Sequence, residues 1–153
     1  MVSYDMTKTP IVNVVDDILA YAATHGASDI HFDPRDDFLM VRMRVDGDLN
    51  DYTKIQKIYE RNLITRIKLL ANMNITESRL PQDGSIKGTI KGIAMETRVS
   101  TLPTNEGEKC VIRILDYSRS LAGIDSLGFN ERNLEKLKKM IKEPNGIILI
   151  TGA

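Results

Sequence analysis

The alternation of side chains between residues 79 and 115 restricts the fold more than any other feature of the chain. Three short runs lie in this stretch, at residues 85–90, 93–101 and 109–115. The second run alternates two sets of side chains: Ile93, Met95, Thr97 and Val99 in one set, and Ala94, Glu96, Arg98 and Ser100 in the other. A period of two is typical of a half-buried strand, and glycine-containing turns separate the runs. The stretch therefore predicts an antiparallel meander whose apolar face needs helices to cover it.

The polar face of this meander carries Arg98 and, in the third run, Arg113. Both arginines are held by strands rather than by loops. A guanidinium is planar, always charged and able to donate two parallel hydrogen bonds, so a fixed arginine suits an anionic partner such as a phosphate. An arginine on a strand can instead pair with a carboxylate of the next strand, and Glu96 and the aspartates near the hairpins are available for this.

The N-terminal half predicts more strands and two helices. The strand-like runs are residues 28–33, 38–45 and, after the hairpin signal Asp46-Gly47, a short strand near 48–52. Thr9-Pro10 predicts the start of a first helix, with Thr9 as N-cap and Gly26 at its end. Apolar residues at helical spacing predict a second helix over 55–72. The predicted fold class is α+β, with both helices on the apolar face of an antiparallel sheet.

The C-terminal residues have the pattern of a second domain. Asn130 is placed to cap a helix over 130–143, which Pro144-Asn145-Gly146 ends. A continuous apolar run follows at 147–150, as in a strand buried on both faces. The predicted domains are residues 1–118, a linker at 119–128, and the start of a second domain at 129–153.

Composition argues against several classes of function. The 153 residues include 21 basic and 21 acidic side chains, so the formal net charge is zero and general nucleic-acid binding is disfavoured. No apolar run approaches the roughly 18 residues of a membrane-spanning helix, which predicts a cytoplasmic protein without membrane insertion. Cys110 is the single cysteine, and its place on the apolar side of a strand predicts a core residue. Asp29, His31 and Asp33 share one side of a strand, and we assign them polar contacts that close loops rather than a metal site.

Several motifs resemble, in their order, those of one protein family. They are residues 26–34, 41–47, Arg79-Leu80-Pro81-Gln82-Asp83-Gly84, 97–104, 107–116, 127–129 and 146–152. Together they resemble the hexameric ATPases that power type II secretion and type IV pilus assembly. The resemblance implies that residues 1–118 are the PAS-like domain preceding the motor domain, and that residues 129–153 contain the first helix and strand of that RecA-like ATPase domain.

The resemblance also implies nucleotide chemistry in the full-length protein. Gly152 falls where the family's Walker A loop begins, as its first glycine. ATP and Mg²⁺ are expected as cofactors of a full-length, ATP-hydrolysing motor, whereas this fragment is expected to bind neither and to be inactive. The implied partners are neighbouring subunits of a homo-hexamer and inner-membrane platform proteins, at the inner face of the cell membrane.

Within such a hexamer, the resemblance gives the first domain a role in trans, in which it offers arginines to the neighbouring subunit's nucleotide. Arg98, in Thr-Arg-Val-Ser, matches one such arginine finger. The family usually has a second basic residue directly after Gln-Asp-Gly, where this chain has Ser85, so Arg113, Arg79 and Lys87 are secondary candidates. A stand-alone PAS-like sensor or protein-binding module, and a DNA-uptake motor of the same family, are the alternative functions.

Overall fold

The computed structural model describes residues 2–115 and 123–151. The chain divides into two compact units, Met1–Asp116 and Tyr117–Ala153. Each unit is described separately below. The predicted linker at 119–128 falls partly outside the described residues.

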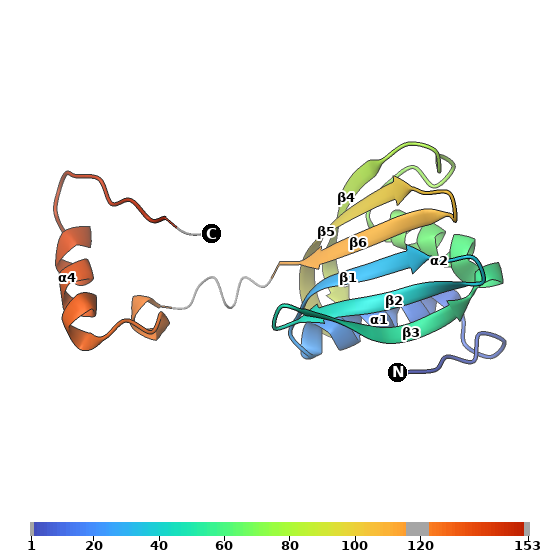
Figure 1. The fold of residues 1–153 in the computed structure, drawn as a ribbon, viewed down its shortest axis with the longest axis horizontal. Coiled ribbons are helices and arrows are strands. Elements are labelled where there is room, and N and C mark those ends of the chain that lie inside the picture. The colour runs from blue at the N-terminus through green and yellow to red at the C-terminus, as the bar shows by residue number, and fades with distance from the viewer. Residues whose placement is uncertain (1, 116–122, 152–153) are drawn as a thin grey trace. The chain divides into compact units, whose positions relative to one another are not determined.

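The first unit contains a six-stranded antiparallel sheet in the order β3-β2-β1-β6-β5-β4 (Figure 1). Its strands are β1 Ala27–Pro34, β2 Phe38–Val45, β3 Asp48–Gln56, β4 Gln82–Ile90, β5 Ile93–Pro103 and β6 Glu108–Ile114. Two meanders, β1–β3 and β4–β6, are joined where β1 pairs with β6. The predicted meander of residues 85–115 is confirmed, and β3 runs four residues beyond the predicted end at residue 52, to Gln56.

Two helices, α1 Ile11–Thr24 and α2 Lys57–Leu70, cover one face of the sheet and lie behind it in Figure 1. The core between helices and sheet includes the fully buried side chains of Ile18, Phe32 and Ile67. This arrangement confirms the predicted α+β class. The predicted N-cap was wrong, because Pro10 precedes α1 directly and no side chain caps the helix. Among the described residues, no helix is both long and apolar enough to span a bilayer.

Two tight turns set the register of the hairpins. Between β2 and β3, Asp46 and Gly47 have φ values of 52° and 92°. Between β4 and β5, Lys91 and Gly92 have φ values of 50° and 78°. Positive φ at both central residues matches the right-handed twist of a two-residue hairpin. The hairpin predicted at Asp46-Gly47 is therefore confirmed.

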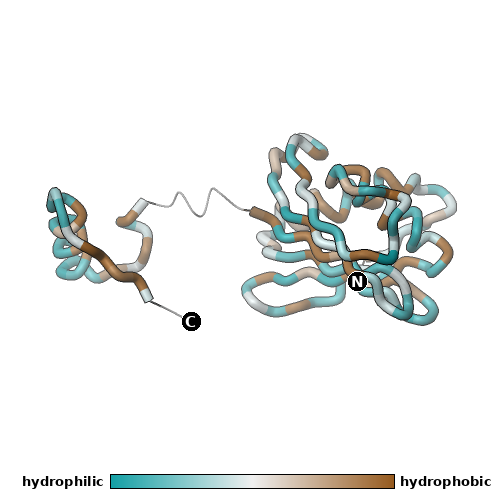
Figure 2. The backbone as a smooth tube through the Cα atoms, turned by 90° about the horizontal axis from the view of Figure 1, so that it is seen from above, coloured by the Kyte–Doolittle hydropathy of each residue, from teal (hydrophilic) through white to brown (hydrophobic). Residues whose placement is uncertain are grey.

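The second unit contains a 3₁₀ turn, Ile124–Ser126, and the helix α4, Glu131–Ile141. Asn130 caps α4 as predicted, since its side-chain oxygen accepts a 2.9 Å hydrogen bond from the Asn133 N–H. The strand predicted at 147–150 is not formed, and Figure 2 shows this apolar segment as an irregular stretch after the helix. A strand requires backbone partners, and the described part of this unit contains no strand for it to pair with.

Candidate functional site

The sheet face opposite the helices, called here the open face, carries the predicted arginines. Arg98 on β5 is exposed, while its sequence neighbours Thr97 and Val99 are buried beneath the sheet. Arg98 lies directly across from Arg113 on β6 and from Ser85 on β4. Residues paired in this way point to the same side of a sheet. The predicted placement of Arg98 and Arg113 is confirmed.

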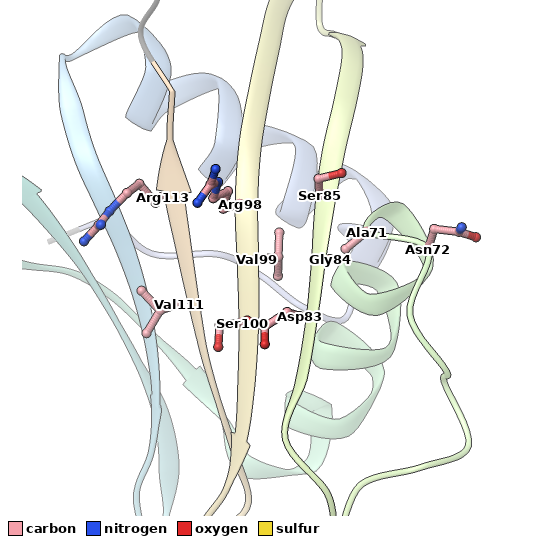
Figure 3. A pocket seen from close by; sticks show the side chains of 10 residues that line it. All are labelled: Ala71, Asn72, Asp83, Gly84, Ser85, Arg98, Val99, Ser100, Val111 and Arg113. Carbon is pink, nitrogen blue, oxygen red and sulfur yellow. The ribbon is translucent and has the colours of Figure 1, made fainter.

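These residues line a hollow of about 790 Å³ on the open face (Figure 3). Strands β4, β5 and β6 supply most of its lining, and two residues just after α2 supply the rest. The lining residues are Ala71, Asn72, Asp83, Gly84, Ser85, Arg98, Val99, Ser100, Val111 and Arg113. The hollow thus combines two guanidinium groups with hydroxyl, amide and carboxylate groups, a set of groups suited to a polar anionic ligand.

One wall of the hollow depends on the absence of a side chain at Gly84. Asp83 and Gly84 both lie within β4, and Gly84 is not among the residues with positive φ, so a turn does not explain this glycine. A Cβ atom at Gly84 would lie 2.4 Å from the Ala71 carbonyl oxygen. Glycine is required here because the strand passes directly against the end of α2, a contact that periodicity does not reveal.

Arg113 is anchored by a carboxylate from another strand. Its Nε donates a 2.9 Å hydrogen bond to Oδ1 of Asp29 on β1. Asp29, only 6% exposed, also lies 3.6 Å from Arg44 Nε and accepts a hydrogen bond from the Ser28 hydroxyl. Burial alone would raise the pKa of Asp29, but the hydrogen bonds from Arg113 and Ser28 outweigh it and hold this pKa below its usual range.

A second carboxylate on β1 is bound in the same way. Asp33 accepts two hydrogen bonds from Arg42, at 2.9 and 2.6 Å, and lies 3.0 Å from Lys109 Nζ. Burial opposes ionisation, yet Lys109 and Arg42 hold the pKa of Asp33 below its usual range. These contacts join neighbouring strands, so the predicted role in closing loops was wrong. Between the two carboxylates, burial lowers the pKa of His31 despite the opposing charges of Asp33 and Asp29.

Arg98 differs from the other open-face arginines that the structure describes. Arg42, Arg44 and Arg113 each have a carboxylate within 4 Å. Arg98 has neither an ion pair nor a side-chain hydrogen bond within the described residues. It is an exposed guanidinium on a strand, and none of its side-chain donors is bonded to a described residue.

The remaining predicted site residues lie outside the hollow. Arg79 is in the loop before β4, 87% exposed, and pairs with Glu77 at 3.2 Å. Lys87 on β4 pairs across the strands with Glu96 on β5 at 2.5 Å. Gly152 lies outside the described residues. The structure therefore brings together Arg98, Arg113 and Ser85, and separates Arg79 and Lys87 from the lining of the hollow.

Cys110 is a core residue, as the sequence predicted. Its side chain is fully buried on the helix-covered face of β6. Burial, reinforced by the charge of Glu108, raises the pKa of this thiol, so the thiolate needed for nucleophilic chemistry is disfavoured. Among the described residues, no cluster of three or more His, Cys, Asp or Glu side chains is placed to hold a metal ion.

Comparison with protein families gives a match over nearly the whole chain. Residues 5–153 match the family model described as "Type II/IV secretion system protein". Among curated proteins, "Type II secretion system protein E" of Pectobacterium carotovorum is 41% identical over 143 residues, which cover 94% of this chain and 29% of the relative. "Type IV pilus assembly ATPase PilB" of Pseudomonas aeruginosa is 40% identical over 151 residues, covering 98% of this chain and 27% of the relative. The chain thus spans less than a third of the length of these relatives.

Solved structures support the fold. The ATPase DotB of Legionella pneumophila matches with a TM-score of 0.53 at 14% identity, over 87% of this chain and 36% of DotB. The pilus retraction motor PilT, solved with bound ADP, matches with a TM-score of 0.50 at 19% identity, over 78% of this chain and 34% of PilT. At these identities the likeness concerns the fold alone.

Proposed function

The chain belongs to the Type II/IV secretion system protein family, and we propose that its first unit is the subunit-interface and arginine-supplying domain of a hexameric ATPase. In this proposal, Arg98 reaches the nucleotide of a neighbouring subunit in trans. The observation that carries the proposal is that, among the described residues, no carboxylate pairs with Arg98, whereas the other described arginines of this face each have one. A charge that no described residue pairs with is available to a partner.

Phosphate chemistry explains why an arginine serves this role. During phosphoryl transfer, negative charge spreads over the oxygens of the transferred group, and a fixed cation stabilises that charge more in the transition state than in the ground state. Arg98 is held by β5, which pairs with β4 on one side and β6 on the other, so its backbone position does not need to be ordered on binding. The planar guanidinium can contact two phosphate oxygens at once.

The wider biology follows from the family and belongs to the same proposal. ATP and Mg²⁺ are the cofactors of the full-length protein, which hydrolyses ATP to drive secretion or pilus assembly. Neighbouring subunits and inner-membrane platform proteins are its partners, on the cytoplasmic side of the membrane. Residues 1–118 form the interface domain, 119–128 a linker and 129–153 the start of the motor domain.

The test is an Arg98→Ala substitution in the full-length protein. We expect ATP turnover to fall by about 100-fold or more, because arginine fingers supplied in trans contribute roughly 10³–10⁵ in rate in GTPases. Nucleotide affinity and melting temperature should change little, since the side chain has no partner among the described residues. Arg98→Lys should restore little activity, because an ammonium cannot reproduce the two-pronged contact.

The matched control is Arg35→Ala. Arg35 is an exposed arginine in the turn between β1 and β2 and does not line the hollow. Its removal should leave turnover near the wild-type value. Full activity of Arg98→Ala in correctly assembled hexamers would refute the proposed role.

A further inference from the structure

The hollow on the open face has two ends of different chemistry (Figure 3). At one end, Arg98 lies across from Ser85, and at the other end Ser100 on β5 lies across from Asp83 on β4. Residues two positions apart on a strand point to the same side and lie about 7 Å apart. A cationic row is therefore followed, one such step along the sheet, by a row that carries a carboxylate and a hydroxyl.

The carboxylate of Asp83 is not used by the described part of the chain. Its side chain is exposed and forms no hydrogen bond or ion pair with a described residue, although Arg98 lies diagonally across on the next strand. Elsewhere on the same face, the carboxylate of Glu96 pairs with Lys87. Ser100 is also exposed, and its hydroxyl has no described partner. Asp83 and Ser100 therefore offer unused hydrogen-bond acceptors to a ligand in the hollow.

The size and charge of the hollow restrict the ligand. Its volume of about 790 Å³ lies within the range of small-molecule sites, roughly 300–1,000 Å³, and so admits more than a phosphate group. Val111 and Ala71 add apolar surface to the lining. A ligand that meets both ends should be anionic beside Arg98. Beside Asp83 it should carry hydroxyl groups instead, because the carboxylate repels a second anion.

We propose that Asp83, assisted by Ser100, binds the sugar hydroxyls of the nucleotide and makes the site selective for ribonucleotides. The inference rests on the proposed function, in which Arg98 contacts a phosphate of the same nucleotide. A carboxylate has two oxygens and can accept one hydrogen bond from each hydroxyl of a ribose. Acidic side chains bind the ribose 2′-hydroxyl in this way in dinucleotide-binding folds. The Ser100 hydroxyl can donate to a sugar oxygen or accept from a hydroxyl.

The test compares the affinities of the assembled full-length protein for ADP and for 2′,3′-dideoxy-ADP, by calorimetric titration without turnover. The wild type should bind dideoxy-ADP at least about tenfold more weakly than ADP, because hydrogen bonds to a charged group are lost. In Asp83→Ala, most of this difference should disappear. The ratio of the two affinities is the readout, because removing the Asp83 charge changes the repulsion of the phosphates equally for both nucleotides.

The matched control is Asp37→Ala, which removes an exposed carboxylate in the turn between β1 and β2, outside the hollow, and should keep the wild-type ratio. Asp83→Asn keeps the shape of the side chain and one acceptor oxygen, and should give an intermediate ratio. Equal binding of both nucleotides by the wild type, an unchanged ratio in Asp83→Ala, or the same loss in Asp37→Ala would overturn the site. A Mg²⁺-dependent loss of both affinities in Asp83→Ala with the ratio unchanged would also overturn it, because Asp83 would then bind the metal.

The outcome is separable from that of the proposed function, because sugar selectivity is measured by binding and the role of Arg98 by turnover. If Asp83→Ala keeps the wild-type ratio while Arg98→Ala abolishes turnover, only the sugar site fails. If Asp83→Ala removes the selectivity but Arg98→Ala keeps full turnover, the proposed function fails.

Discussion

The two halves of the open face differ in how their charged side chains are paired. On β1 and β2, Asp29 and Asp33 are nearly buried and each is bound by arginine. On β4 and β5, Arg98 stands in a hollow without any described ion-pair partner. We call the surroundings of Asp29 and Asp33 the paired half of the face and the surroundings of Arg98 the unpaired half, although the more exposed Lys87 and Glu96 form an ion pair farther along β4 and β5.

Under the proposed function, the difference separates charges that serve the fold from a charge that serves a partner. A nearly buried carboxylate must keep its cation, because a desolvated charge left alone is costly. An exposed guanidinium has no such requirement, since water solvates it. Changes in the paired half should therefore alter stability, whereas changes at Arg98 should alter activity.

The largest effect of the paired half on the free energy of unfolding should appear when the pH is lowered. The pKa values of Asp29 and Asp33 are lowered in the folded state, so their stabilisation is present above the unfolded value of about 3.9 and is lost as pH falls through the folded pKa. The lowered pKa of His31 acts in the same direction, because the unfolded chain binds its proton first below about pH 6.5. Urea unfolding across pH should show a small loss of stability below pH about 6.5 and a larger one below about 4.

The control is the double variant Asp29→Asn/Asp33→Asn. It should be less stable at neutral pH and should lose less additional stability in acid. An acid profile below about pH 4 identical in slope to that of the wild type would contradict the assignment of this loss to the two carboxylates.

A single substitution in the paired half should have a smaller but clear effect. Asp33→Asn removes the charge that accepts from Arg42 and faces Lys109. We expect a loss of about 2 kcal/mol in the free energy of unfolding, the scale of a hydrogen-bonded charge in a nearly buried site. Chemical denaturation of the 153-residue chain measures it.

The matched change in the unpaired half is Arg98→Ala. Its cost in unfolding free energy should be below about 0.5 kcal/mol, because the substitution removes an exposed side chain that has no partner in the described part of the chain. Relief of the repulsion from Arg113 offsets part of any packing lost from its stem. Equal destabilisation by Asp33→Asn and Arg98→Ala would remove the distinction between the two halves.

Periodicity predicted which face each strand residue occupies. The alternation around Arg98 placed its side chain on the open face, and Asp46-Gly47 marked a hairpin, because both signals depend on residues close in sequence. Local signals also predicted both helices of the first unit and the Asn130 cap. The role of Arg98 and the domain boundaries remain predictions.

Periodicity could not predict contacts between residues that are far apart in the sequence. The bond between Arg113 and Asp29 joins residues 84 positions apart and depends on the pairing of β6 with β1. The need for glycine at position 84 depends on the approach of Ala71 from α2. The predicted strand at 147–150 failed for a related reason, since apolar character alone does not supply a strand partner.

The central claim is that Arg98 acts on the nucleotide of a neighbouring subunit. The most direct test mixes two inactive full-length variants, Arg98→Ala and one lacking the phosphate-binding lysine of its own nucleotide site. In mixed hexamers, some interfaces combine an intact nucleotide site with an intact Arg98 from the next subunit, so ATP turnover should reappear. Mixed hexamers that form but remain inactive would contradict the account, because Arg98 would then act within its own subunit or only on structure.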